Sequence, residues 1–231
     1  MSVTRLSPVE LERLTRLDSC TVANAVESFG VRLRNTGFTN SSVHSIFPDF
    51  PPAVGYAATA RIRTSAPPME GHNYYDRTDW WNHILSIPSP RVVALEDVDA
   101  TPGIGSLVGE IHANILHALG CVAVVTNGAV RDLQAARALR FQMFAGNVSV
   151  SHAYAHVFEF GGAVTVGGMK VLPGDLLHGD AHGVLKVPLE IADKVADVSA
   201  EIIRKEKQII ALCQSADFTL DKLREAVKDW K

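Results

Sequence analysis

The chain has 231 residues, 47% of them hydrophobic, and its 22 Lys and Arg nearly balance its 25 Asp and Glu, for a formal net charge of −3. This composition allows a sizeable hydrophobic core. The sequence has no Lys/Arg-rich run and no apolar run of about 20 residues, which excludes a clustered basic surface and a membrane span. We therefore expect neither nucleic acid nor a membrane as a partner.

Two features of the sequence predict a cytoplasmic location. The segment from Met1 to Pro8 contains no apolar core of a secretion signal. The three cysteines are odd in number and widely spaced, at Cys20, Cys121 and Cys213. We expect them to be free, mostly buried thiols in a reducing compartment, without a disulfide framework.

The N-terminal third predicts two helices and then a loop. Residues 7–16 open with Ser-Pro-Val-Glu, which supplies an N-cap, a proline at the first helical position and the acidic residue of a capping box. The apolar spacing over residues 21–29 predicts a second helix that stops at Gly30. Residues 31–53 have no periodic pattern and should form a loop.

The next segment alternates strand and helix signals. Residues 54–64 and 92–95 are rich in small and branched apolar side chains and should form strands. Between them, Thr78 and Asp79 can cap a short helix that runs through Leu85.

Aromatic side chains gather around the start of this helix. The stretch from His72 to His83 contains Tyr74, Tyr75, Trp80 and Trp81. These aromatics could select the far end of a small substrate, or they could pack in the core or at a subunit interface, and the sequence leaves both readings open.

One βα unit carries the densest chemistry of the chain. Residues 109–119 predict a helix stopped by a glycine, and residues 121–126 predict a buried strand followed by an Asn-Gly turn. Arg131 and Asp132 then stand where the next helix begins.

The two ends of this unit carry groups that suit a small, metal-chelating oxo-acid. Free backbone N–H groups at the helix start at Gly109 can hold an anion, and Arg131 offers a fork of donors to a carboxylate or enolate oxygen. Asp132 supplies a hard oxygen ligand for a divalent metal. An Arg-Asp pair at a helix N-terminus can also be plain surface, because the Asp satisfies the helix dipole.

The C-terminal half changes from strands to long helices. Residues 164–171 predict a hairpin around a Gly-Gly turn, because both central residues of such a turn need positive φ. Residues 189–214 and 220–227 show helical apolar spacing. No linker divides the chain, so we expect a single domain over residues 1–231, built from N-terminal helices and a loop (1–53), an α/β core with the site (54–188) and C-terminal helices (189–231).

The whole pattern resembles a known family. Glu110, a spacer over residues 111–130 and then Arg131-Asp132 are similar to the motif of the family that contains class II 4-hydroxy-4-methyl-2-oxoglutarate aldolases and the regulator of ribonuclease E activity A. The resemblance extends from about residue 17 to residue 188.

The resemblance implies a fold and a set of roles. The fold is α/β, the family's swivelling β/β/α sandwich, with a βαβ core, a β-hairpin-rich segment and C-terminal helices. A homotrimer or homohexamer is implied, as is a divalent metal ion, Mg²⁺ or Mn²⁺, bound by Asp132. The pyruvate-like group of a substrate would be held at Gly109, Glu110, Ile111, His112 and Arg131.

One position departs from the family pattern. Many aldolase members carry a further carboxylate three residues after the metal-binding Asp, and this chain has Ala135 there. The missing carboxylate changes which groups could lie in the outer coordination shell of the metal, and so which reaction the chain would catalyse.

Nine histidines are the oddity of the composition. His152 and His156 would share one face of a helix as metal ligands, but an extended segment would separate them by about 13 Å. The alternative roles for this pair are polar packing and substrate contact. His178 and His182 flank a turn that Asp180 is expected to organise.

The sequence therefore predicts a divalent-metal-dependent lyase acting on pyruvate-derived oxo-acids. The reaction would be retro-aldol cleavage of a 4-hydroxy-2-oxo acid or decarboxylation of an oxaloacetate-like acid, through a metal-stabilised pyruvate enolate. Arg131 would stabilise the enolate, and a metal-bound water oriented by Glu110 would take the substrate hydroxyl proton. The alternatives are a non-catalytic regulator that binds a partner protein, and a metal enzyme of other chemistry that uses the histidine-rich segment.

Overall fold

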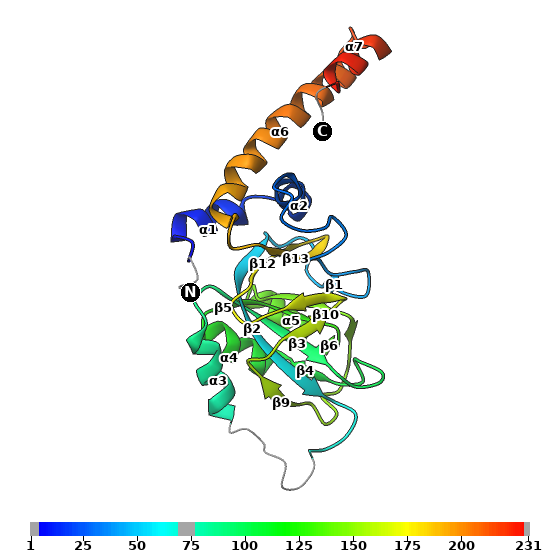
Figure 1. Ribbon diagram of the computed structural model, residues 1–231. Coiled ribbons are helices and arrows are strands. Elements are labelled where there is room, and N and C mark those ends of the chain that lie inside the picture. Colours follow the sequence, from blue (N-terminus) through cyan, green and yellow to red (C-terminus); the bar gives the residue numbers. More distant parts are fainter. Residues whose placement is uncertain (1–4, 69–76, 229–231) are drawn as a thin grey trace.

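The computed structural model describes residues 5–68 and 77–228, and its framework is one large sheet. The strand order is β1-β7-β5-β3-β2-β12-β13, with β9 paired to β2 off this path, so the eight strands form a nearly closed sheet (Figure 1). The strands are β1 (His44–Ser45), β2 (Ala53–Arg63), β3 (Arg91–Asp97), β5 (Cys121–Thr126), β7 (Gln142–Ala145), β9 (His156–Phe160), β12 (Leu176–Asp180) and β13 (Gly183–Val187).

Besides the large sheet, the described residues form two smaller β elements. A three-stranded sheet joins β4 (Ser106–Val108), β6 (Ala129–Val130) and β8 (Asn147–Val148), all parallel. A hairpin joins β10 (Val164–Val166) to β11 (Met169–Val171). Gly167 and Gly168 in its turn have φ of 54° and 76°, which confirms the predicted Gly-Gly turn.

Helices cover one face of the large sheet and extend beyond it. They are α1 (Pro8–Thr15), α2 (Ser19–Ser28), α3 (Arg77–Ser86), α4 (Glu110–Ala118), α5 (Leu133–Ala138), α6 (Ala192–Gln214) and α7 (Leu220–Ala226). The predicted capping box of α1 is present, with Ser7 and Glu10 bonded in both directions. Figure 1 shows α6 and α7 projecting away from the sheet. Over the described ranges, none of the helices is both long and apolar enough to cross a membrane.

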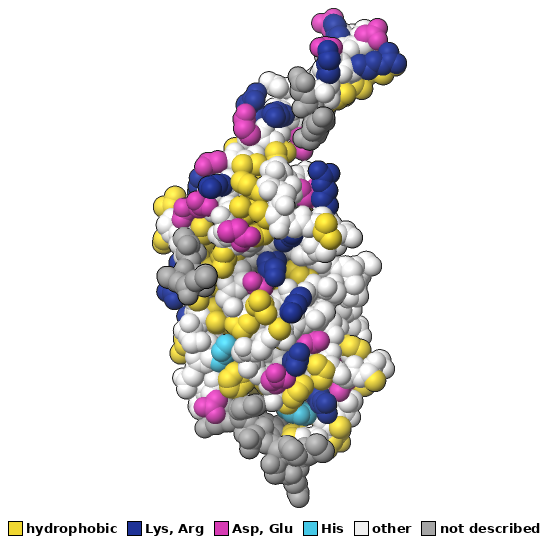
Figure 2. Space-filling view, viewed as in Figure 1, with side chains coloured by type: hydrophobic (Ala, Val, Ile, Leu, Met, Phe, Trp, Pro, Cys, Tyr) yellow, Lys and Arg dark blue, Asp and Glu magenta, His cyan; other side chains and the backbone are white. Residues whose placement is uncertain are grey.

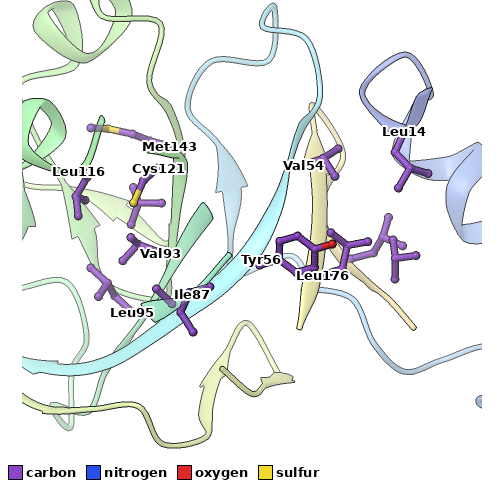
Figure 3. Packing of buried hydrophobic residues seen from close by; sticks show 14 of the residues in the cluster. Leu14, Val54, Tyr56, Ile87, Val93, Leu95, Leu116, Cys121, Met143 and Leu176 are labelled. Carbon is purple, nitrogen blue, oxygen red and sulfur yellow. The ribbon is translucent and has the colours of Figure 1, made fainter. Parts of the chain in front are cut away.

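Both faces of the large sheet are buried, which explains the apolar composition of its central strands. On β3, Val93 and Leu95 belong to the larger core cluster, together with Leu116 of α4 and Tyr56 of β2 (Figure 3). Residues 92 and 94 point to the opposite face, where a second cluster includes the β10–β11 hairpin. The layers are therefore hairpin, sheet and helices, which confirms the predicted α/β sandwich.

The parallel strands β3, β5 and β7 are neighbours in the sheet and are connected through α4 and α5. Such connections need a crossover that packs back on the sheet, and the buried side chains of these helices, Ala113, Leu116 and Ala136, make that contact. The predicted βαβ core is confirmed, and β5 spans the predicted residues 121–126.

Some predictions about the elements are corrected. Residues 31–53 are not all loop, because His44 and Ser45 pair with β7. Helix α2 begins two residues earlier than predicted, since the Asp18 side chain accepts from the backbone N–H of Thr21. Helix α3 begins before the predicted cap, at Arg77, and α6 begins at Ala192 rather than at residue 189.

The thiols are free, as predicted, but they are not mostly buried. Cys20 and Cys213 are exposed, since Cys213 lies on the projecting part of α6 and Cys20 on the outer side of α2. Only Cys121 of these three is buried, and burial raises the pKa of its thiol to about 12.

The aromatic segment before α3 is only partly described. Trp80 is buried beside His83 and Phe160, and Trp81 packs on the same core cluster, so these two rings belong to the core. His72, Tyr74 and Tyr75 lie outside the described residues.

Charges of both signs are interspersed on the surface seen in Figure 2. No basic cluster is visible on that face, in line with the near balance of charge in the sequence.

A buried histidine ties the N-terminal helices to the sheet. His178 of β12 donates from Nε2 to the backbone oxygens of Leu14 and Leu17, at 3.1 and 3.0 Å. Its Nδ1 is buried without a hydrogen-bond partner in the described part of the chain. Burial lowers the pKa of His178 below its usual 6.5, although the two carbonyls and the Asp180 carboxylate act in the opposite direction.

This burial predicts a pH-dependent stability. Below about pH 6.5 the unfolded chain binds a proton at His178 that the folded chain resists, so the free energy of unfolding should fall as the pH falls through that range. Urea unfolding at pH 7.5 and 5.5 measures this loss. In His178→Gln, which retains an amide donor but does not titrate, the loss should be smaller, and an equal loss in both proteins would contradict the assignment.

Candidate active site

The parallel pair β4 and β6 brings the two halves of the predicted motif together. Ser106 pairs with Ala129 and Val108 with Val130, so the strands end side by side. The backbone N–H of Arg131 donates to the Val108 oxygen at 3.1 Å and continues this contact by one residue. The start of α4 and the Arg-Asp pair, separated in sequence by a helix and a strand, therefore meet in space.

The Asp132 carboxylate caps α4 from outside that helix. Its Oδ2 accepts a hydrogen bond of 2.9 Å from the backbone N–H of Glu110. Gly109, the N-cap residue, has no side chain to do so. Asp132 is also the N-cap residue of α5, yet its side chain does not cap that helix. The carboxylate is thus held at the positive end of the α4 dipole.

Asp132 adopts an unusual backbone conformation to reach this position. Its φ and ψ are 54° and 45°, in the left-handed region that Asp and Asn enter more readily than other non-glycine residues. Such a conformation costs on the order of 1–3 kcal/mol and persists where surrounding contacts enforce it.

Gly109 makes room for this arrangement. A Cβ on Gly109 would lie 2.3 Å from Asp132 Oδ2 and 2.9 Å from the Nε of Arg131. Arg131 Nε lies 3.6 Å from Asp132 Oδ2, and both side chains are partly exposed. The absence of a side chain at position 109 is therefore what allows the guanidinium and the carboxylate to approach the helix start together.

These groups line one wall of a cleft of about 610 Å³. Glu110, Ile111 and His112 lie on the same wall, so the cleft contains all the residues predicted for the site. Residues 152–155 supply a further part of the cleft wall. The sequence did not indicate this wall, because it comes from an irregular loop before β9.

An acidic network supports the loop that leads to β4. Asp97 accepts from the backbone N–H groups of Gly103 and Asp99, and Asp99 accepts from the hydroxyl and the N–H of Thr64. Burial raises the pKa of Asp97, while its two backbone hydrogen bonds oppose the rise. The Thr64 hydroxyl in turn accepts from Gly105 N, one residue before β4.

The donor set suits a hard divalent cation that keeps much of its water. Asp132 Oδ2 is committed to the Glu110 amide, which leaves Oδ1 for a metal, and the exposed Glu110 side chain lies on the same wall. Mg²⁺ commonly takes one or two carboxylates and completes its shell with water and substrate. Across the described ranges, no group of three or more His, Cys, Asp or Glu side chains is placed to hold an ion.

The histidines singled out in the sequence lie in different structural settings. His152 lies in the loop and His156 begins β9, so the two are not on one helix face. Of the two readings that the sequence left open, the structure excludes the helical ligand pair. Asp180 does organise the turn before β13, because its carboxylate accepts from the N–H of His182. It also accepts from the N–H and hydroxyl of Ser19, which joins this turn to α2.

Comparisons with known proteins cover nearly the same residues as the resemblance seen in the sequence. A family model described as RraA-like (Aldolase/RraA) matches residues 19–186. The chain belongs to the RraA-like family. A protein of Halalkalibacterium halodurans named "Putative 4-hydroxy-4-methyl-2-oxoglutarate aldolase" is 31% identical over 84 residues, which are 36% of this RraA-like chain and 40% of that protein. The chain thus covers less than half of that relative's length.

Solved structures support the fold over most of the chain. An uncharacterized protein from Pseudomonas syringae superposes with a TM-score of 0.75 and 21% identity, covering 97% of each chain. Streptomyces coelicolor RraAS2, described as an unusual member of the RNase ES inhibitor RraA protein family, gives 0.69 and 20% identity, covering 88% of this chain and 96% of its own. At these identities the likeness shows the RraA-like fold alone.

The role of Gly109 can be tested on stability. In Gly109→Ala the new methyl group must displace the Asp132 carboxylate from the α4 N-terminus, so the free energy of unfolding should fall by about 1–3 kcal/mol. Gly162→Ala is the matched control, because its methyl group would meet only the end of the Glu159 side chain at 3.2 Å. Chemical denaturation measures both, and a Gly109→Ala protein as stable as the control would refute the steric argument.

Proposed function

We propose that this chain is a divalent-metal-dependent lyase acting on pyruvate-derived oxo-acids. Its reaction would be retro-aldol cleavage of a 4-hydroxy-2-oxo acid, decarboxylation of an oxaloacetate-like acid, or both. The observation that carries the proposal is the meeting of Arg131, Asp132 and the α4 start on one wall of a cleft. The aldolase branch of the RraA-like family, and the name of the Halalkalibacterium relative, support the same reaction class.

The chain's own groups fit the charged end of such a substrate. The amide of Ile111, in the first turn of α4, has no intrahelical carbonyl to bond and suits a carboxylate. Arg131 adds a planar pair of donors beside them. Asp132 would hold the metal, which when bound chelates the oxo-acid and neutralises charge that develops on its 2-oxo oxygen.

Both reactions break a bond to carbon 3 and leave a pyruvate enolate. Arg131 would stabilise this charge by a fixed donor, an interaction whose loss typically costs about 3–4 kcal/mol of transition-state stabilisation. Glu110, exposed at the cleft, would orient the water that exchanges protons with the substrate.

The direct test is pyruvate release from a panel of 4-hydroxy-2-oxo acids and from oxaloacetate. Each assay contains Mg²⁺ or Mn²⁺, or a chelator, and a protein-free sample corrects for spontaneous decarboxylation. Protein-dependent pyruvate release that stops with chelator would support the proposal. No release from any member of the panel would reject it.

The assignment of Asp132 can be tested by Asp132→Asn. Asn tolerates the left-handed backbone and its amide oxygen can still accept from Glu110, so the fold should persist while the charge that binds metal is lost. We expect at least a hundredfold loss of metal-dependent turnover and weaker Mn²⁺ binding by calorimetry, with little change in melting temperature. Asp221→Asn, on exposed α7, is the control. Unchanged Mn²⁺ affinity in Asp132→Asn would reject the assignment.

A second candidate function is regulation by binding a partner protein. Two observations favour it: Ala135 stands where many aldolase members carry a carboxylate, and RraAS2 is described within an inhibitor family. Such a binder has no need of a metal-dependent oxo-acid site. Failure of the pyruvate assay, combined with tight binding to a purified ribonuclease E-type enzyme, would favour this function.

We propose a homotrimer or homohexamer as the assembled form. The support is the family resemblance and the apolar side chains that remain exposed on the C-terminal arm, Ile210, Phe218, Leu220 and Val227. Helix α7 has no buried residue in the single chain, and short helices of this kind gain most of their stability from packing.

A further inference from the structure

A loop that lines the same cleft as Arg131 presents a histidine whose hydrogen-bond partner fixes its tautomer. His152 lines the cleft, and its Nδ1 lies 2.7 Å from the backbone oxygen of Ala153. A carbonyl oxygen can only accept, so Nδ1 carries the hydrogen in this contact. In the neutral ring the other nitrogen, Nε2, is then an acceptor with an available lone pair.

Several hydrogen bonds hold the irregular loop that carries His152. The backbone N–H of Ala153 donates to the Ser151 hydroxyl at 2.9 Å, and Ser106 N donates to the Ser151 oxygen at 3.0 Å. Tyr154 N donates to the Thr64 oxygen, so the loop is tied to both β4 and the end of β2.

The backbone geometry of this loop also indicates a functional position. Ala153 has φ of 46°, a conformation that a residue with a Cβ rarely adopts. A Cβ on Gly105 would lie 2.5 Å from the His152 oxygen, so the loop packs directly on the chain that leads to β4. Asp132 and Ala153, which both line the cleft, are two of the three non-glycine residues with positive φ in the described ranges. Strain of this kind gathers where side chains must be placed for function.

We infer that His152 is a catalytic residue that takes the hydroxyl proton of a 4-hydroxy-2-oxo acid. The inference rests on the proposed function and extends it. The pyruvate end of the substrate would lie at Arg131 and Asp132, and the remainder of the substrate would extend toward His152, which lines the same cleft. The carbon 4 hydroxyl is the group that must lose a proton, and Nε2 of His152 is a proton acceptor among the side chains that line the cleft.

The step balances without a further reactant. The hydroxyl proton passes to His152 Nε2, the O–H electron pair becomes the second bond of a new carbonyl at carbon 4, and the bond from carbon 3 to carbon 4 breaks. The pair from that bond forms the pyruvate enolate beside Arg131. The water oriented by Glu110 then protonates carbon 3, and the imidazolium returns its proton to solvent.

This assignment separates the two reactions of the proposed function. Decarboxylation of oxaloacetate also leaves the enolate, but it has no hydroxyl to deprotonate. His152 should therefore matter for retro-aldol cleavage and not for decarboxylation, whereas Glu110, Arg131 and Asp132 should matter for both.

The test is His152→Asn, assayed on a 4-hydroxy-2-oxo acid and on oxaloacetate with Mg²⁺. The Asn amide can replace Nδ1 as donor to the Ala153 oxygen and preserve the loop, but it has no counterpart of Nε2. We expect retro-aldol kcat to fall at least a hundredfold, with decarboxylation within about threefold of the wild type. His117→Gln, an exposed histidine at the end of α4, is the control and should keep both activities.

A second variant guards against a purely structural effect. Added imidazole should restore part of the cleavage activity of His152→Ala and should not affect decarboxylation. Equal loss of both reactions, or loss of neither, would overturn the role of His152 while leaving the lyase proposal standing. A wild-type protein that decarboxylates oxaloacetate but cleaves no hydroxy acid would also overturn it. A wild-type protein inactive on both substrates would overturn the proposed function and the inference together.

Discussion

The hydrogen bond between the Glu110 amide and the Asp132 carboxylate is the constraint on which the site depends. It joins the starts of two helices that belong to successive βα units, and it fixes one oxygen of Asp132 while leaving the other for a ligand. The left-handed backbone of Asp132 and the missing side chain at Gly109 both follow from it. The N-terminus of α4, which could bind an external anion, thus already binds a carboxylate of the protein itself.

The rest of the fold holds the two ends of this contact in place. Helices α4 and α5 pack on one face of the sheet and the β10–β11 hairpin covers the other, so β3, β5 and β7 are buried on both faces. The short parallel strands β4, β6 and β8 follow β3, β5 and β7 along the chain and set the register of the cleft wall. Because interiors pack densely, a shift at β4 or β6 would move Arg131 and Asp132 together.

Local signals in the sequence predicted the local structure well. The strand over residues 121–126, the capping box of α1 and the Gly-Gly hairpin each depend on neighbouring residues, and all three are confirmed. Tertiary pairing was beyond such signals: β6 and β8 have two residues each and exist only because they pair with each other and with β4. Because local signals do not predict tertiary contacts, the sequence also did not predict the capping of α4 by Asp132, the cleft wall at residues 152–155 or the exposure of Cys213 on the projecting helix.

Calorimetric titration of oxalate and pyruvate into the wild-type protein, with Mg²⁺ and with chelator, tests directly whether the cleft binds a metal-chelated enolate. Oxalate resembles the planar enolate, and a site complementary to the transition state should bind it more tightly than pyruvate. We expect both acids to bind only with Mg²⁺, and oxalate to bind more tightly than pyruvate. Oxalate binding of equal strength in the presence of chelator, or no oxalate binding under either condition, would contradict it.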